Sequence, residues 1–145
     1  MRADAMGLLG LHRTAGPQQT EALAARLAVA LEPGDVVLLS GELGSGKTTF
    51  VRGACRALGV SGRVTSPTFT IGRRYEAGVP ISHLDLYRLG DLAGEDPGLL
   101  ADYLGPDRVA FVEWPEAAGE TLPGVVARVR FAHGGRDVRE IEIAR

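Results

Sequence analysis

The sequence is poor in several features that would indicate a disulfide, a membrane segment or a nucleic-acid surface. Its one cysteine, Cys55, excludes a disulfide within the chain. No apolar run approaches the ~18 residues of a membrane-spanning helix, and the first residues lack the apolar segment of a signal peptide. We therefore expect a cytoplasmic protein that makes no membrane contact. The net charge of −2 provides no general attraction to nucleic acid, so any contact with RNA has to be local or to come through a partner.

The composition is otherwise that of an ordinary globular domain. Apolar residues make up 45% and charged residues 23% of the 145 residues. A chain of this length buries a sizeable core as one unit. We therefore expect residues 1–145 to form a single domain.

Lysine is also scarce, because the chain has 15 arginines but one lysine, Lys47. This lysine lies in residues 41–48, Gly-Glu-Leu-Gly-Ser-Gly-Lys-Thr, which fit the phosphate-binding pattern G-x-x-x-x-G-K-[ST]. An apolar run, 36–39, precedes this segment and a helix-like run, 49–58, follows it, and that order makes an anion site at a helix N-terminus. We name residues 41–48 the glycine-rich loop and predict that it binds phosphate. The predicted phosphate-binding residues are Leu43, Gly44, Ser45, Gly46, Lys47, Thr48 and Thr49.

Two side chains of the loop have specific expected roles. The Lys47 ammonium should reach the β- and γ-phosphates of a nucleotide, and the Thr48 hydroxyl should ligate Mg²⁺. A site of this kind also needs a carboxylate near the metal, usually at the end of a buried strand. Glu113 follows the wholly apolar run 109–112, so we predict that it is the second metal ligand; the alternative is a solvent-facing glutamate. The predicted catalytic residues are Lys47, Glu113 and Asp85.

Asp85 is the second acidic candidate. It would bind Mg²⁺ through water or position the attacking water, and a plain salt bridge to Arg88 is equally compatible with the sequence. His83 either senses phosphate or is a structural histidine beside a strand. Arg136 and Arg139 are candidates for nucleotide contact, although arginines on a terminal hairpin are usually solvated.

The lack of asparagine gives partial evidence on the identity of the nucleotide base. The chain contains no asparagine, so the Asn-Lys-x-Asp motif that reads guanine in Ras-like GTPases cannot be present. ATP is therefore favoured over GTP. Residues 14–18, just before the first expected helix, are predicted to contact the adenine.

Hydrophobic periodicity and turn residues predict an α/β fold of the P-loop NTPase type, with a mixed central sheet, flanking helices and an antiparallel C-terminal hairpin. Helices are expected at 17–31, at 49–58 and after Asp96. Strands are expected at 6–11, 36–40, 69–75, 79–84, 109–112, 125–131 and 138–143. The hydroxyl-rich residues 65–68 resemble a switch loop or a rigid turn.

Four motifs occur in a fixed order along the chain. They are Gly-Glu-Leu-Gly-Ser-Gly-Lys-Thr-Thr (41–49), Thr-Ser-Pro-Thr-Phe-Thr (65–70), His-Leu-Asp-Leu-Tyr-Arg (83–88) and Glu-Trp-Pro-Glu (113–116). Together they resemble the TsaE (YjeE) family of small P-loop ATPases, and the similarity covers residues 17–143.

The resemblance implies a Mg²⁺-dependent ATPase that works with TsaB and TsaD partners. In that system a threonylcarbamoyl group is placed on the adenosine beside the anticodon of tRNA, and the resemblance implies that this chain acts on tRNA indirectly, through the partner complex. It further implies that Thr48 and Glu113 bind Mg²⁺ and that Asp85 acts in ATP hydrolysis. Slow, partner-dependent turnover is expected.

Two other functions remain compatible with the glycine-rich loop. In the first, the chain is a nucleotide-gated binding module whose partner affinity is switched by ATP binding without required hydrolysis. In the second, it is a small-molecule kinase, although the sequence has no arginine-rich insertion that resembles a lid.

Overall fold

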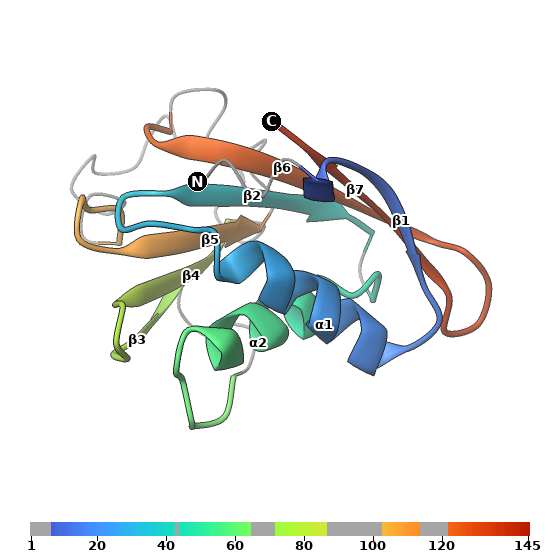
Figure 1. Ribbon diagram of the computed structural model, residues 1–145, viewed down its shortest axis with the longest axis horizontal. Helices are drawn as coiled ribbons and strands as arrows, with labels where there is room; N and C mark the ends of the chain where they lie inside the picture. Colours follow the sequence, from blue (N-terminus) through green and yellow to red (C-terminus); the bar gives the residue numbers. More distant parts are fainter. Residues whose placement is uncertain (1–6, 43, 65–71, 87–102, 114–121) are drawn as a thin grey trace.

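The computed structural model describes residues 7–42, 44–64, 72–86, 103–113 and 122–145. These residues form a seven-stranded mixed sheet with two helices on one of its faces (Figure 1). The strands are β1 (Gly10–Thr14), β2 (Val36–Gly41), β3 (Gly72–Tyr75), β4 (Ile81–Asp85), β5 (Val109–Glu113), β6 (Val125–His133) and β7 (Arg139–Ala144). The helices are α1 (Pro17–Ala28) and α2 (Lys47–Ala57).

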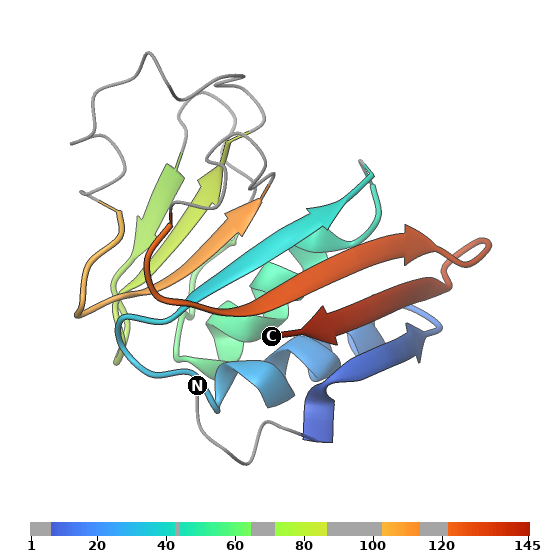
Figure 2. The same ribbon diagram turned by 90° about the horizontal axis from the view of Figure 1, so that it is seen from above.

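The centre of the sheet is parallel and its edges are antiparallel. Strands β6, β2, β5 and β4 run parallel in that order, so their carboxyl ends meet at one edge of the sheet (Figure 2). Strands β2 and β5 are almost wholly apolar because they are covered on both faces. Beyond this centre, β3 pairs with β4 on one side, and β7 and then β1 extend the sheet on the other.

The two helices lie on the same face of the sheet because each has one apolar side. Helix α1 buries Leu23 and Leu27, and α2 buries Phe50 and Val51, all between helix and sheet. The Phe50 ring meets the ring of Phe131 on β6 edge to face, with 5.4 Å between centroids. A second apolar cluster covers the opposite face of the parallel centre and consists of Val36, Leu38, Leu84, Leu86, Ala110 and Val112.

Helices α1 and α2 pack closely against each other at Gly53. A Cβ at Gly53 of α2 would lie 2.4 Å from the carbonyl oxygen of Glu21 and 2.5 Å from its Cα. A side chain there would therefore overlap the backbone of α1. The glycine is required by this close approach, and the contact fixes both helices relative to each other.

The predicted elements that fall on described residues are present, and most of their ends differ by one or two residues. Two differences are larger. Helix α1 stops at Ala28 and not at residue 31, because Ala30 and Leu31 donate to carbonyls three residues back in a tighter turn. Both side chains remain buried, so the apolar period continues past the helix. The first strand spans Gly10–Thr14, whereas 6–11 was predicted, since its register is set by pairing with β7, where Gly10 lies opposite Ile143.

Several predicted features lie outside the described residues: the motif at 65–70, the helix expected after Asp96, and the part of the Glu-Trp-Pro-Glu motif that follows Glu113. The end of the motif 83–88 also lies outside them, and so does the alternative salt bridge of Asp85 to Arg88. The two predicted hairpins are confirmed as β3–β4 and β6–β7 where the chain is described. Neither helix of the described segments is long and apolar enough to cross a membrane.

Candidate functional site

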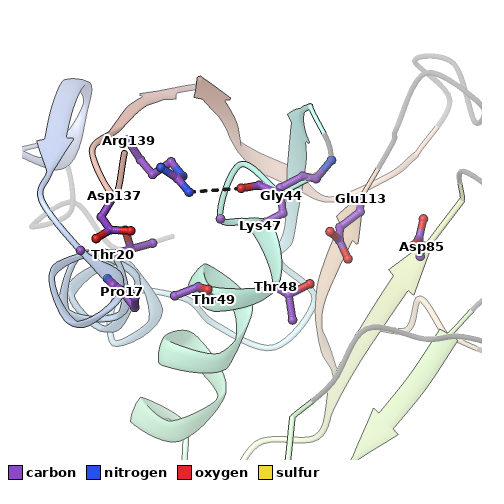
Figure 3. Close-up of a pocket in the computed structure, with 12 residues that line it drawn as sticks. Pro17, Thr20, Gly44, Lys47, Thr48, Thr49, Asp85, Glu113, Asp137 and Arg139 are labelled. Atoms are coloured by element: carbon purple, nitrogen blue, oxygen red, sulfur yellow. Dashed lines mark hydrogen bonds between the residues drawn. The ribbon is translucent and has the colours of Figure 1, made fainter. Parts of the chain in front are cut away.

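The carboxyl ends of the parallel strands open into a cavity of about 340 Å³ (Figure 3). Open α/β sheets bind ligands at this edge. The cavity is lined by Gly16, Pro17, Thr20, Gly44, Gly46, Lys47, Thr48, Thr49, Asp85, Glu113, Asp137 and Arg139. In Figure 3 the two strand-end carboxylates lie at one end of the cavity, the start of α2 lies in the middle, and residues of α1 and of the β6–β7 turn lie at the other end.

The glycine-rich loop leaves β2 through backbone conformations that favour glycine. Gly41, Gly44 and Gly46 have φ values of +144°, +74° and +106°. A Cβ at Gly41 would lie 2.6 Å from the carbonyl oxygen of Phe131, whereas nothing lies within 4 Å of a Cβ position at Gly44. The loop is therefore packed tightly against β6 at its start and has open space beside it at Gly44, as a ligand that contacts backbone would need.

The N-terminus of α2 faces the cavity without a capping side chain. Its N-cap residue is Gly46, no acidic residue occupies its first turn, and its first helical hydrogen bond runs from Phe50 N to Gly46 O at 2.9 Å. The amides of Lys47, Thr48 and Thr49 therefore precede the helical ladder, where the helix dipole favours an anion. This arrangement fits a phosphate group.

Lys47 and Ser45 are both held inside the loop. Lys47 is 5% exposed, and its Nζ donates to the carbonyl oxygen of Gly41 at 2.6 Å. The Ser45 Oγ is buried, and no hydrogen-bond partner for it occurs among the described residues. Of the seven predicted phosphate-binding residues, five line the cavity, Ser45 is buried beneath them, and Leu43 lies outside the described residues.

The two predicted carboxylates are brought together by the sheet. Asp85 on β4 lies opposite Glu113 on β5 in the parallel register, and both line the cavity. Glu113 is 3% exposed, so the alternative of a solvent-facing glutamate is wrong. Thr48 lines the same cavity, which places the predicted metal ligands Thr48 and Glu113 around one space. The metal role itself stays a prediction.

His83 has a partner that the sequence did not indicate. Its Nε2 lies 2.6 Å from Oε2 of Glu113, and the two side chains are 0% and 4% exposed. His83 is absent from the cavity lining, so it lies beneath Glu113 and does not face a ligand. The sequence indicates only that His83 lies within one buried strand and Glu113 at the end of another, and the register of β4 against β5 brings them into contact.

Arg139 reaches the glycine-rich loop from a strand far along the chain. Its Nη2 donates to the carbonyl oxygen of Gly44 at 3.4 Å, and its Nη1 donates to the carbonyl oxygens of Arg136 at 2.7 Å and Val138 at 3.0 Å (Figure 3). The guanidinium therefore links the β6–β7 turn to the glycine-rich loop by hydrogen bonds, and it is not simply solvated. Asp137 also lines the cavity and was missed, since nothing in the sequence distinguishes it from other turn residues.

The stretch predicted to contact adenine lies at the end of the cavity away from the carboxylates. Gly16 and Pro17 line the cavity there, together with Thr20 of α1. The hydroxyls of Thr14 and Thr20 are 2.7 Å apart and form a buried hydrogen bond, which ties β1 to the first turn of α1. The position agrees with a nucleoside subsite, and the adenine contact stays a prediction.

The order of elements, the glycine-rich loop and the cavity at the strand ends define a P-loop NTPase-like α/β protein. The family model described as "Threonylcarbamoyl adenosine biosynthesis protein TsaE" matches residues 14–141 of the chain. The chain belongs to the TsaE family, as its four motifs indicated.

Individual relatives agree with this assignment. The tRNA threonylcarbamoyladenosine biosynthesis protein TsaE of Bacillus subtilis (strain 168) is 43% identical over 130 residues, which cover 89% of this chain and 81% of that protein. The protein of the same name from Streptomyces coelicolor is 47% identical over 111 residues, covering 74% of this chain and 75% of that one. Among solved structures, Bacillus subtilis YdiB superposes with a TM-score of 0.72 at 35% identity, over 92% of this chain and 82% of that chain.

Proposed function

We propose that this protein is a Mg²⁺-dependent ATPase required for the threonylcarbamoyladenosine modification of tRNA at the adenosine next to the anticodon, and that it acts with TsaB and TsaD partners. The relatives named for tRNA threonylcarbamoyladenosine biosynthesis support the pathway. One arrangement in the structure supports the chemistry: the uncapped N-terminus of α2, the buried Lys47 and two carboxylates line a single cavity.

The phosphate end of the nucleotide would be held by the loop and α2. Lys47 supplies the one lysine ammonium of the chain, and its present bond to the Gly41 carbonyl keeps it in the loop. The backbone amides at the start of α2 and the open side of Gly44 supply donors and space. These groups bind and orient the β- and γ-phosphates.

The residues around the strand ends fit Mg²⁺ that arrives with the nucleotide. Mg²⁺ is usually held by one or two protein oxygen ligands together with substrate phosphates and water. Thr48 and Glu113 provide such oxygens, and the described residues contain no cluster of three metal-ligating side chains that would hold an ion without a nucleotide. When bound, the ion would neutralise charge that develops on the phosphates.

Asp85 lies beside Glu113 and is more exposed than it. A carboxylate in that position would orient the attacking water or hold a water of the metal shell. The base would lie at the other end of the cavity, near Gly16 and Pro17. ATP is favoured over GTP because the chain contains no asparagine for a guanine-reading motif.

Glu113→Gln tests the proposal, because glutamine keeps the shape and the acceptor for His83 but removes the negative charge. We expect the variant to bind ATP and both partners, to hydrolyse ATP at least about 100-fold more slowly, and to support no tRNA modification in an assay reconstituted with TsaB and TsaD. Glu76→Gln is the matched control, since Glu76 is a 70% exposed side chain distant in the sheet from the strand ends.

The result also separates ATP hydrolysis from the nucleotide-gated module. If Glu113→Gln no longer hydrolyses ATP but still supports full modification, the chain is a module that acts through binding alone. If it hydrolyses ATP at the rate of the Glu76→Gln control, the metal site is assigned to the wrong carboxylate.

A further inference from the structure

The buried contact between His83 and Glu113 is not explained by core packing alone. Both side chains are removed from water, and a buried polar pair contributes little to stability compared with an apolar pair of similar volume. Glu113 lines the cavity and His83 does not, so the histidine contacts the carboxylate from outside the cavity lining. The contact therefore bears on how the Glu113 carboxylate is oriented toward the cavity.

The sheet fixes this pair from two strands. Along β4, His83 and Asp85 are two residues apart and so share a face, and Asp85 lies opposite Glu113 on β5. The imidazole therefore lies one step deeper than the carboxylate edge and reaches up to it. Neither strand end can shift without breaking the ladder between β4 and β5, which includes Leu86 N to Glu113 O at 3.1 Å.

The hydrogen bond between the two side chains joins Nε2 of His83 to Oε2 of Glu113. Toward an ionised carboxylate, which only accepts hydrogen bonds, Nε2 of His83 is the donor. The Nδ1 atom is buried, and no partner for it occurs among the described residues.

We propose that His83 is a positioning residue that holds Glu113 for the cation bound with the nucleotide. It donates to Oε2 and fixes the carboxylate rotamer in advance, so that Glu113 would present its remaining acceptor sites to the cation in one orientation. Outer partners of metal ligands act in this way in many metal sites. This inference rests on the proposed function, because it concerns the metal of the same site.

Two substitutions separate this role from a merely structural one. His83→Leu removes the donor at similar volume, and His83→Gln keeps an N–H donor near the position of Nε2. Ser82→Ala is the matched control, because Ser82 is equally buried on β4 but accepts from Arg108 on the other face of the strand. Like the His83 substitutions, Ser82→Ala removes a buried hydrogen bond of β4, so any loss of stability is of the same kind, but Ser82 does not contact Glu113.

The measurement is the Mg²⁺ concentration that gives half of the metal-dependent gain in binding of a non-hydrolysable ATP analogue, with a parallel titration in EDTA. We expect His83→Leu to raise that concentration at least about tenfold, His83→Gln to stay within about threefold of the unsubstituted protein, and neither to change binding in EDTA. Ser82→Ala should leave both quantities unchanged.

Three results would overturn the positioning role. They are a Mg²⁺ requirement of His83→Leu equal to that of the unsubstituted protein, an equal change in Ser82→Ala, and a loss of analogue binding in EDTA as large as the loss with Mg²⁺. If the unsubstituted protein itself shows no metal-dependent binding of the analogue, the proposed function fails. If that binding is present and only the variants behave as listed above, the positioning role fails and the proposed function stands.

A second measurement holds even if His83→Leu does not fold. Nitrogen NMR of the unsubstituted protein without nucleotide should show a proton on Nε2 of the His83 ring, since only an Nε2–H can donate to Glu113. A ring protonated on Nδ1 alone cannot donate to Glu113 and would contradict the inference.

Discussion

Asp85 and Glu113 lie side by side at the carboxyl ends of two neighbouring parallel strands, but their surroundings differ. Glu113 is 3% exposed and is held by a buried histidine, whereas Asp85 is partly exposed to the cavity. A fixed carboxylate suits a metal ligand, and a more exposed one suits contact with water. The two residues are therefore expected to respond differently to substitution.

Asp85→Asn should leave ATP binding intact and slow hydrolysis by about 100-fold, because it removes a charge that acts on water and leaves the loop unchanged. Equilibrium binding and single-turnover hydrolysis measure the two effects. An unchanged Mg²⁺ requirement identifies the water-positioning role, and a raised requirement identifies contact with the metal shell. Hydrolysis at the unsubstituted rate would exclude Asp85 from the reaction.

Lys47→Ala should lower ATP affinity by about 10- to 100-fold, since a charge-assisted hydrogen bond to phosphate contributes about 1.5–3 kcal/mol. Titration calorimetry gives the affinity, and the circular dichroism spectrum should remain that of the folded protein. Arg26→Ala is a suitable control because it removes one positive charge from the last turn of α1. Equal affinities for Lys47→Ala and this control would show that the glycine-rich loop is not the ATP site.

Gly53→Ala should destabilise the fold, although alanine is the better helix former by about 1 kcal/mol. The new Cβ would meet the backbone of Glu21 at 2.4 Å, and α1 cannot yield without separating from α2. Overpacking of this kind costs about 1–3 kcal/mol, so we expect a lower urea midpoint. Gly62→Ala, which meets nothing within 4 Å, should change stability by less than about 0.5 kcal/mol. A Gly53→Ala protein as stable as the Gly62→Ala protein would refute the close crossing.

Cys55 should make stability fall at alkaline pH. Burial raises the pKa of its thiol to about 12, above the value of roughly 8.5 in an unfolded chain. Because the folded-state pKa is the higher one, the stabilisation is complete below about pH 8.5 and is lost as the pH rises toward 12.

Urea unfolding at pH 7.5 and 9.5 measures this effect. The unsubstituted protein should lose about 1 kcal/mol more between the two pH values than Cys55→Ala does. Thiol reagents should label native Cys55 only as fast as the chain unfolds. Equal pH dependence of the two proteins, or rapid labelling of the native chain, would contradict a buried thiol.

The parts of the fold that could be predicted from the sequence are those with short-range causes. The glycine-rich loop, the apolar run of β5 and the β6–β7 hairpin each carry their pattern within a few residues. The placement of Glu113 in the site followed from the same rule, because the residue after a buried parallel strand lies at the ligand-binding edge.

The parts that could not be predicted depend on which strands become neighbours. His83 meets Glu113 only because β4 pairs with β5, and Arg139 reaches Gly44 across 95 positions only because β7 lies beside β6. Nothing in the local pattern specifies those neighbours. Helix α1 was predicted to extend beyond its observed end for a local reason. The apolar period continues to Leu31, whereas the hydrogen bonding changes after Ala28.

The pairing of β1 with β7 has a consequence for the order in which the protein is completed during synthesis. Strand β1 leaves the ribosome first among the strands, yet the strand it pairs with is β7, the last of them. Pairing over such a separation closes slowly and cannot begin until β7 has emerged. Since β1 leads directly into Gly16 and Pro17, the wall of the cavity at these two residues is set in place after the glycine-rich loop, and a nascent chain that ends before β7 carries the loop without that wall.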